Sequence, residues 1–180
     1  ATLWKYGGVD DDFNLTPLQM PQGQHFVRVQ ADGSILFFDN NTTCSGVAPQ
    51  LARFYTPDPA LGGQTLCDIR GFGTRFVKVS IDETAHAVQS FQEWRVANSP
   101  SAQSWSGQAL QFTSYRGSVT QLPGGHFVAG FGSKAAAERD VVEWDPVAGA
   151  AVFALYFDLD GATPAQATVS SYRAAFFPSH

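Results

Sequence analysis

Two stretches of the chain repeat one pattern of short apolar runs around a turn, and this repeat most constrains the fold. VRVQADGSILFF (27–38) aligns with VTQLPGGHFVAG (119–130), which places Gly33 on Gly125, Ile35 on Phe127 and Phe37 on Ala129. Apolar residues alternate within both stretches, and each contains glycine where the chain must reverse. A period of two that is broken by turn residues is typical of antiparallel β-hairpins.

The same alternation runs through the rest of the chain, and helical periodicity is confined to one turn near 134–138. VKVSIDETAHAVQSF (77–91) aligns with VVEWDPVAGAAVFAL (141–155), each with an Asp-containing turn. SYRGSV recurs as SYRAAF, and LWKY resembles EWRV. We therefore predict an all-β fold, with strands near residues 2–6, 25–30, 34–39, 75–81, 86–94, 116–122, 126–131, 140–144, 150–157 and 172–177.

The repeating unit is four consecutive antiparallel strands, the unit of a β-propeller blade. The chain, residues 1–180, then forms a single propeller portion of about two and a half blades, whereas about four are needed to close a ring. We expect a second protein chain, or further copies of this one, to complete the ring. The chain is then a part of a cleaved precursor or of an oligomer. The alternative is a self-contained β-sandwich or barrel.

An insertion at about 41–74 separates the second and third strands of the first blade and carries both cysteines, Cys44 and Cys67. No zinc-ligand set surrounds them, so we predict a disulfide that restrains this long loop; two free thiols are the alternative. Asn40 and Asn41 begin overlapping Asn-x-Thr glycosylation acceptors. A disulfide and glycans both favour a secreted or periplasmic protein.

Composition excludes several classes of function. The net charge is −5 and only 15% of residues are charged, without a Lys/Arg cluster, so nucleic acid is not an expected partner. The chain has no apolar run near 20 residues, so we expect no membrane span. We find no phosphate loop, no Ser-His-Asp pattern and no metal-ligand spacing, and we expect neither a cofactor nor a metal.

Five short motifs, in order, resemble the arylsulfotransferase (arylsulfate sulfotransferase-like) family. They are LWKYGG, GQHFVRVQADGSILFFDN, RFVKVSID, GSVTQLPGG and SYRAAF. The resemblance implies the C-terminal part of a six-bladed propeller that moves a sulfuryl group between phenols without a cofactor. A histidine nucleophile forms a sulfohistidine intermediate in such enzymes, which splits one difficult step into two.

His25 falls on the family's Gln-His motif, so the resemblance implies that it is the catalytic group at the propeller funnel. The alternative is a hydrogen-bonded histidine at a strand start. The chain departs from the family because Phe26 stands where an aspartate is usual. An arginine expected after Phe38-Asp39-Asn40 is also missing; Arg53, Arg70 or Arg75 are its possible replacements.

Substrate-binding candidates come from the repeated Ser-Tyr-Arg segments. Arg116 and Arg173 hold matching positions, and a guanidinium matches the geometry of a sulfate group; pairing with carboxylates is the alternative. Tyr115 and Tyr172 stack on an aromatic ligand or pack between blades, and Trp105 is a further candidate for ligand contact.

Two functions follow from these residues. The first is an arylsulfotransferase-like enzyme that acts on small aromatic or sulfated compounds, in which His25, Arg116 and Arg173 converge in one pocket. The second is a non-catalytic secreted propeller that binds a ligand or a protein, in which these side chains are satisfied by their neighbours.

Overall fold

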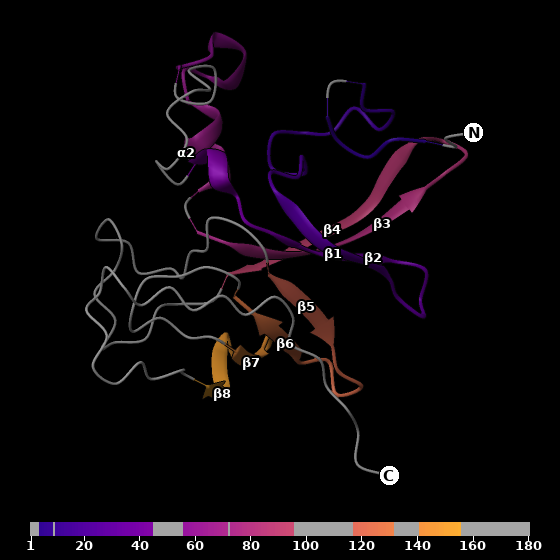
Figure 1. The fold of residues 1–180 in the computed structure, drawn as a ribbon. Coiled ribbons are helices and arrows are strands. Elements are labelled where there is room, and N and C mark those ends of the chain that lie inside the picture. The colour runs from indigo at the N-terminus through magenta and orange to yellow at the C-terminus, as the bar shows by residue number, and fades with distance from the viewer. Residues whose placement is uncertain are drawn as a thin grey trace.

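The computed structural model describes residues 4–8, 10–44, 56–71, 73–95, 117–131 and 141–155. Within them the chain forms two four-stranded antiparallel sheets, each with its strands in sequence order (Figure 1). The all-β prediction is therefore confirmed. The first sheet contains β1 (Gln24–Val29), β2 (Ile35–Asp39), β3 (Arg75–Asp82) and β4 (Ala87–Arg95). The second contains β5 (Ser118–Gln121), β6 (Phe127–Gly130), β7 (Val141–Asp145) and β8 (Ala150–Leu155).

The first hairpin of each sheet closes with the same hydrogen bonds. In the β1–β2 turn, Gln30 N donates to Ser34 O and Gly33 N to Gln30 O, at 2.7 and 3.0 Å. In the β5–β6 turn, Leu122 N donates to His126 O and Gly125 N to Leu122 O, at 2.8 and 2.9 Å. Gly33 and Gly125 have φ values of +80° and +89°, which a side chain would disfavour. The sequence repeat is therefore a repeat of structure.

The last hairpin of each sheet is also repeated. Asp82 Oδ1 accepts hydrogen bonds from the backbone N–H groups two and three residues later, and Asp145 Oδ1 does the same. The strand pairing shifts register at one point in each hairpin, which leaves Gln89 in β4 and Val152 in β8 without a partner residue. Each of these residues follows its turn aspartate by the same seven positions. These bulges indicate that the two sheets share their irregularities as well as their strand order.

The two sheets pack face to face on one apolar core. The first sheet contributes its inner face (Leu36, Phe38 and Phe76), all fully buried or nearly so. The second sheet contributes residues that alternate along its strands. They are Val119, Phe127, Ala129, Val142 and Trp144. The sheets approach each other where β5 lies against β2 and β1.

Gly117, just before β5, allows this approach. Its φ is +123°, and a Cβ placed on it would lie 2.3 Å from Cε1 of Phe38. No side chain fits in that space without moving the buried ring. The glycine is therefore required both by the backbone conformation and by the contact between the sheets.

The first sheet has a second apolar cluster on its outer face (Ile35, Phe37, Val77 and Val79). The N-terminal segment lies over part of it, with Tyr6 ring-to-ring against Phe37 at 6.3 Å. Residues 4–6 form no strand, although we predicted one near 2–6. They lie over a sheet face rather than beside a strand edge, and the carbonyl of Lys5 accepts from the backbone N–H of Asp12 at 3.0 Å instead of from a neighbouring strand.

The insertion contains short helices and the predicted disulfide. Cys44 ends η1 (Thr42–Cys44), Cys67 lies in α2 (Leu66–Arg70), and the two are bonded with their Cα atoms 5.1 Å apart. A further turn, η2 (Pro59–Leu61), precedes α2. Thr65 and Asp68 cap α2 reciprocally, each side chain accepting from the backbone N–H of the other. The bond and the cap together fix α2 at the end of the first sheet (Figure 1).

Candidate functional site

His25 lies in β1 at the end of the first sheet where β2 ends and β3 begins. It pairs with Phe38 in β2, and the next pairs in the row are Gln24 with Asp39 and Asp39 with Arg75. The ladder shifts register after His25, and Phe26 has a φ of +54°. A positive φ is rare for a bulky residue and often marks a functional or strained position.

The imidazole of His25 is half-buried, and burial lowers its pKa below the ordinary value; the negative charge of Asp39 opposes this shift. The ring is therefore neutral at neutral pH, the protonation state that a nucleophile or general base requires. A neutral ring is compatible with the chemical role that the resemblance implies, and that role stays a prediction. A neutral ring also fits the alternative of a hydrogen-bonded histidine at a strand start.

Asp39 is the centre of a buried charge cluster beside His25. Its carboxylate contacts Arg75 at 2.9 Å and Arg70 at 3.3 Å, and all three side chains are fully buried. The backbone N–H groups of Gln22 and Asn41 donate to Asp39 Oδ1 at 2.9 and 3.1 Å. Charged partners and hydrogen bonds together compensate the cost of burying this carboxylate.

The two arginines also hold the loop that precedes β1. Arg70 Nη1 donates to the carbonyls of Pro17 and Met20, and Arg75 donates to the carbonyls of Leu18 and Met20. Burial, aided by the neighbouring Arg75 charge, lowers the pKa of Arg70 to about 10, so it remains charged at neutral pH.

Two further charges extend the cluster toward the surface. Glu93 accepts from Arg75 at 2.6 Å and contacts Arg95 at 3.2 Å. Arg95 also donates to the carbonyls of Gly73 and Arg70. Burial lowers the pKa of Arg95, and the Glu93 charge opposes the shift.

These contacts bear on the arginine that the family pattern lacks. Arg70 comes from the insertion and reaches the neighbourhood of Asp39, where a replacement would be needed. Its Nε donates to Asn41 Oδ1 at 3.1 Å, so Nε, Nη1 and Nη2 all have partners within the chain. A sulfate group would have to break this cluster to bind Arg70 or Arg75, so we assign both a structural role.

The glycosylation candidates belong to the same region. The side chains of Asn40 and Asn41 are fully buried, and Asn41 Nδ2 donates to the carbonyls of Gly71 and Gly73 at 2.8 and 3.2 Å. A glycan on this nitrogen is incompatible with the folded arrangement of Asn41. A glycan on the buried Asn40 would likewise require the end of β2 to open.

The predicted substrate-binding residues lie outside the described residues, as does Arg53. The substrate-binding candidates are Arg116, Arg173, Tyr115, Tyr172 and Trp105. Their convergence with His25 stays a prediction.

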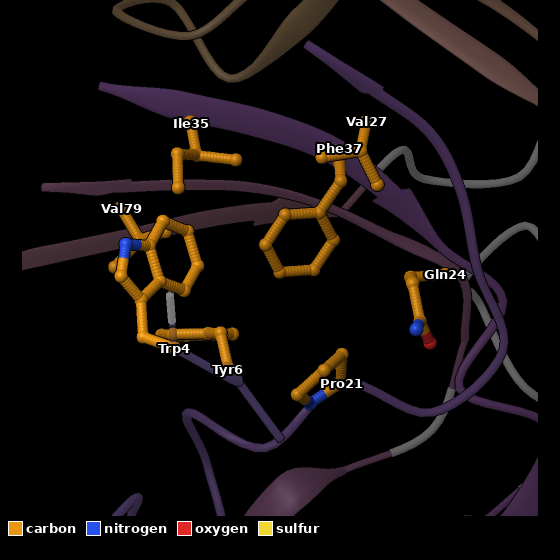
Figure 2. Close-up of a pocket in the computed structure, with 8 residues that line it drawn as sticks. All are labelled: Trp4, Tyr6, Pro21, Gln24, Val27, Ile35, Phe37 and Val79. Carbon is orange, nitrogen blue, oxygen red and sulfur yellow. The ribbon is translucent and has the colours of Figure 1, made fainter. Parts of the chain in front are cut away.

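An apolar hollow of about 120 Å³ lies on the outer face of the first sheet (Figure 2). Its walls combine the sheet residues Ile35, Phe37 and Val79 with Trp4 and Tyr6 from the N-terminal segment. Val27 in β1, Pro21 and Gln24 complete the lining, and the Gln24 amide stands at one side of it. Ligand pockets for small molecules usually measure about 300–1,000 Å³, so this hollow suits one or two side chains better than a whole substrate.

Sequence reasoning missed both the charge cluster and the hollow. The two buried arginines meet carbonyls up to 57 positions away, such as Leu18 for Arg75, and only the folded loop shows which carbonyls they meet. The hollow had a visible signal in β2, where Ile35 and Phe37 form one apolar side of the strand and Leu36 and Phe38 form the other. Such strands are buried on both faces.

Comparisons with protein families, with curated proteins and with solved structures find no match to this chain. Within the described residues, no helix is long and apolar enough to cross a membrane.

Proposed function

We propose that this chain is a propeller-type binding module of an extracytoplasmic protein, and that the outer face of its first sheet binds a protein partner. The observation that carries this proposal is the combination of an aromatic-walled hollow and exposed valines on that face. Val27 and Val29 are 57% and 74% exposed. Apolar residues gathered on one surface mark interaction sites.

The charged groups near His25 favour binding over catalysis. Arg70 and Arg75 are fully buried, and their guanidinium groups are engaged by Asp39, by Asn41 or Glu93, and by backbone carbonyls. Guanidinium groups with these partners stabilise the fold, and an anion could bind them only by displacing those partners. The disulfide fits an oxidising compartment, which is consistent with secretion.

A photoreactive residue at position 27 tests partner binding in the organism that makes the protein. We expect Val27 replaced by a benzophenone-bearing residue to cross-link to a polypeptide on irradiation, because the side chain lies at the hollow. The same replacement at Val147, which is 96% exposed in the β7–β8 turn, is the control. Absence of any protein cross-link at position 27, or equal cross-linking at both positions, would contradict the proposal.

A catalytic role for His25 is the second candidate, and Gln22 favours it. Both polar atoms of the Gln22 amide are buried and form no hydrogen bond among the described residues. Buried polar groups usually have partners, and Gln22 precedes His25 by three positions, so a ligand bound at this end of β1 would supply partners for the amide. In a sulfuryl transfer, an imidazole nitrogen would attack sulfur, and the S–O bond to the donor phenol would break. The oxygen of the acceptor phenol would then attack sulfur and lose its proton to the donor phenolate or to water, and the S–N bond would break to return the neutral imidazole.

This second candidate is tested with 4-nitrophenyl sulfate as donor and a phenol as acceptor. If His25 is catalytic, the unaltered protein should transfer the sulfuryl group to the phenol and His25→Gln should not. Gln22→Leu should transfer it more slowly than the unaltered protein. Absence of transfer, or transfer that survives His25→Gln, rules it out.

A further inference from the structure

The outer face of the first sheet corresponds to a face that is covered in the second sheet. The hairpin repeat places Ile35 on Phe127 and Phe37 on Ala129. Phe127 and Ala129 are fully buried against the inner face of the first sheet. Ile35 and Phe37 belong instead to the outer face, with the hollow in front of them. By this correspondence, the part of the outer face that is still exposed, around the hollow, Val27 and Val29, is the place where another sheet would pack.

The tryptophans indicate how that sheet would lie. Trp94, in the last strand of the first sheet, has its ring centroid 4.6 Å from that of Phe127 in the second sheet. LWKY aligns with EWRV, so Trp4 corresponds to Trp94. Trp4 lines the hollow together with Ile35, the counterpart of Phe127 (Figure 2). Trp4 therefore packs on the outer face as Trp94 packs on Phe127, and the hollow beside it is the part of this face that the N-terminal segment leaves uncovered.

The second sheet carries the complementary surface on its far face (Val128, Val141, Glu143 and Phe153). These residues alternate with the ones that pack against the first sheet, so they point away from it. The repeat that aligns Ile35 with Phe127 also aligns Leu36 with Val128. The far face of the second sheet therefore corresponds to the inner face of the first sheet, to which Leu36 belongs. Phe153 is 54% exposed. The chain therefore carries both faces of a sheet-to-sheet contact. The outer face of the first sheet and the far face of the second sheet lie on opposite sides of the stacked pair.

We propose that copies of this chain associate head to tail, with the far face of one copy against the outer face of the next. This inference rests on the proposed function and names the partner as a second copy of the chain. A second copy is favoured because a single chain carries both complementary faces. A head-to-tail contact leaves one face of each kind free in a pair of copies, so association continues until a ring closes.

Two surface substitutions test the direction of this contact. Val27→Asp places a charge on the outer face, and Phe153→Asp places one on the far face; both side chains are more than half exposed, so both variants should fold. We expect each variant alone to be monomeric, because each lacks one of the two faces. An equimolar mixture should form a pair of twice the monomer mass, since each variant supplies the face that the other lacks.

The measurement is the mass in solution over a concentration series, with circular dichroism to confirm that the variants fold. Val147→Asp, in the exposed β7–β8 turn, is the control and should associate like the unaltered chain. A mixture that stays monomeric overturns the proposal, as does self-association of either variant alone. Cross-linking of position 27 to an unrelated polypeptide would overturn the second copy as partner but support partner binding. Absence of any cross-link would contradict both.

Discussion

Gly117 is the residue whose side-chain size most directly controls the contact between the two sheets. A Cβ there meets the Phe38 ring at 2.3 Å, and the residue has a φ of +123°. Overpacking typically costs about 1–3 kcal/mol, and a left-handed backbone adds about 1–2 kcal/mol for a non-glycine residue. We predict that Gly117→Ala lowers the free energy of unfolding by about 2 kcal/mol or more, measured by urea denaturation.

Gly124 offers the matched control, because a Cβ there meets nothing within 4 Å. Gly124→Ala should change the free energy of unfolding by less than about 0.5 kcal/mol, as is usual for surface substitutions. Equal stability of the two variants would show that Phe38 does not approach β5 as described.

The lowered pKa of His25 predicts a pH dependence of stability. Because the folded pKa lies below the ordinary value of 6.5, the unfolded chain binds more protons between the two values, and stability rises with pH there. The contribution is fully present above pH 6.5 and is lost as the pH falls toward the folded value. In His25→Gln this contribution is absent. The stability of the unaltered protein relative to this variant should therefore decline below pH 6.5, measured by denaturation at several pH values. A relative stability that rises as the pH falls would contradict the assignment.

At the scale of the elements, Arg70 ties α2 to the sheet and to the loop before β1. Arg70→Met leaves Asp39 buried with Arg75 as its remaining ionic partner. Removal of one member of a buried ion pair costs about 3–5 kcal/mol, and the remaining Arg75 places the expected loss near 3 kcal/mol. Thermal and urea denaturation measure this loss.

Lys5→Met is the control for the loss of an ion pair. The Lys5–Asp10 pair is exposed, and exposed pairs contribute at most about 1 kcal/mol. A loss for Arg70→Met as small as that for Lys5→Met would mean that the guanidinium of Arg70 is not buried at Asp39.

The Cys44–Cys67 disulfide closes a loop with a sequence separation of 23. For a loop of that length, the chain-entropy model predicts a stabilisation of about 3 kcal/mol. We expect the Cys44→Ser/Cys67→Ser double variant to lose about this much, measured by urea denaturation. An unchanged unfolding free energy would show that α2 is held by Arg70 and its cap alone.

Most strands were predictable from the sequence because each hairpin combines local alternation with local turn chemistry. The predicted strand at 34–39 agrees with β2, and 75–81 with β3. The predicted strand near 2–6 was wrong for residues 4–6, because a strand also needs a neighbouring edge. The roles of Arg70 and Arg75 were not predictable, since their partners are carbonyls of a distant loop and carry no sequence signal. His25 could be singled out, but its neutral state depends on how the fold buries it.

At the scale of the whole molecule, two equivalent sheets stack on a common core, and the stack presents complementary faces on its two sides. This arrangement agrees with the four-strand unit that the sequence repeat predicts. The closed propeller stays a prediction, and so does the number of its blades. Packing of one more sheet on the outer face explains both the hollow and the exposed valines.

The test of this packing is native mass determination of the purified protein, together with denaturing mass analysis of every chain present. We expect a concentration-dependent mass that is a multiple of the 19.4 kDa chain, with no other polypeptide present. A mass of one chain at every concentration would contradict it, because the hollow and the exposed Val27 and Val29 would then remain uncovered in solution. A complex with a different polypeptide would support the outer face as a binding surface, but it would show that the partner is not a second copy of this chain.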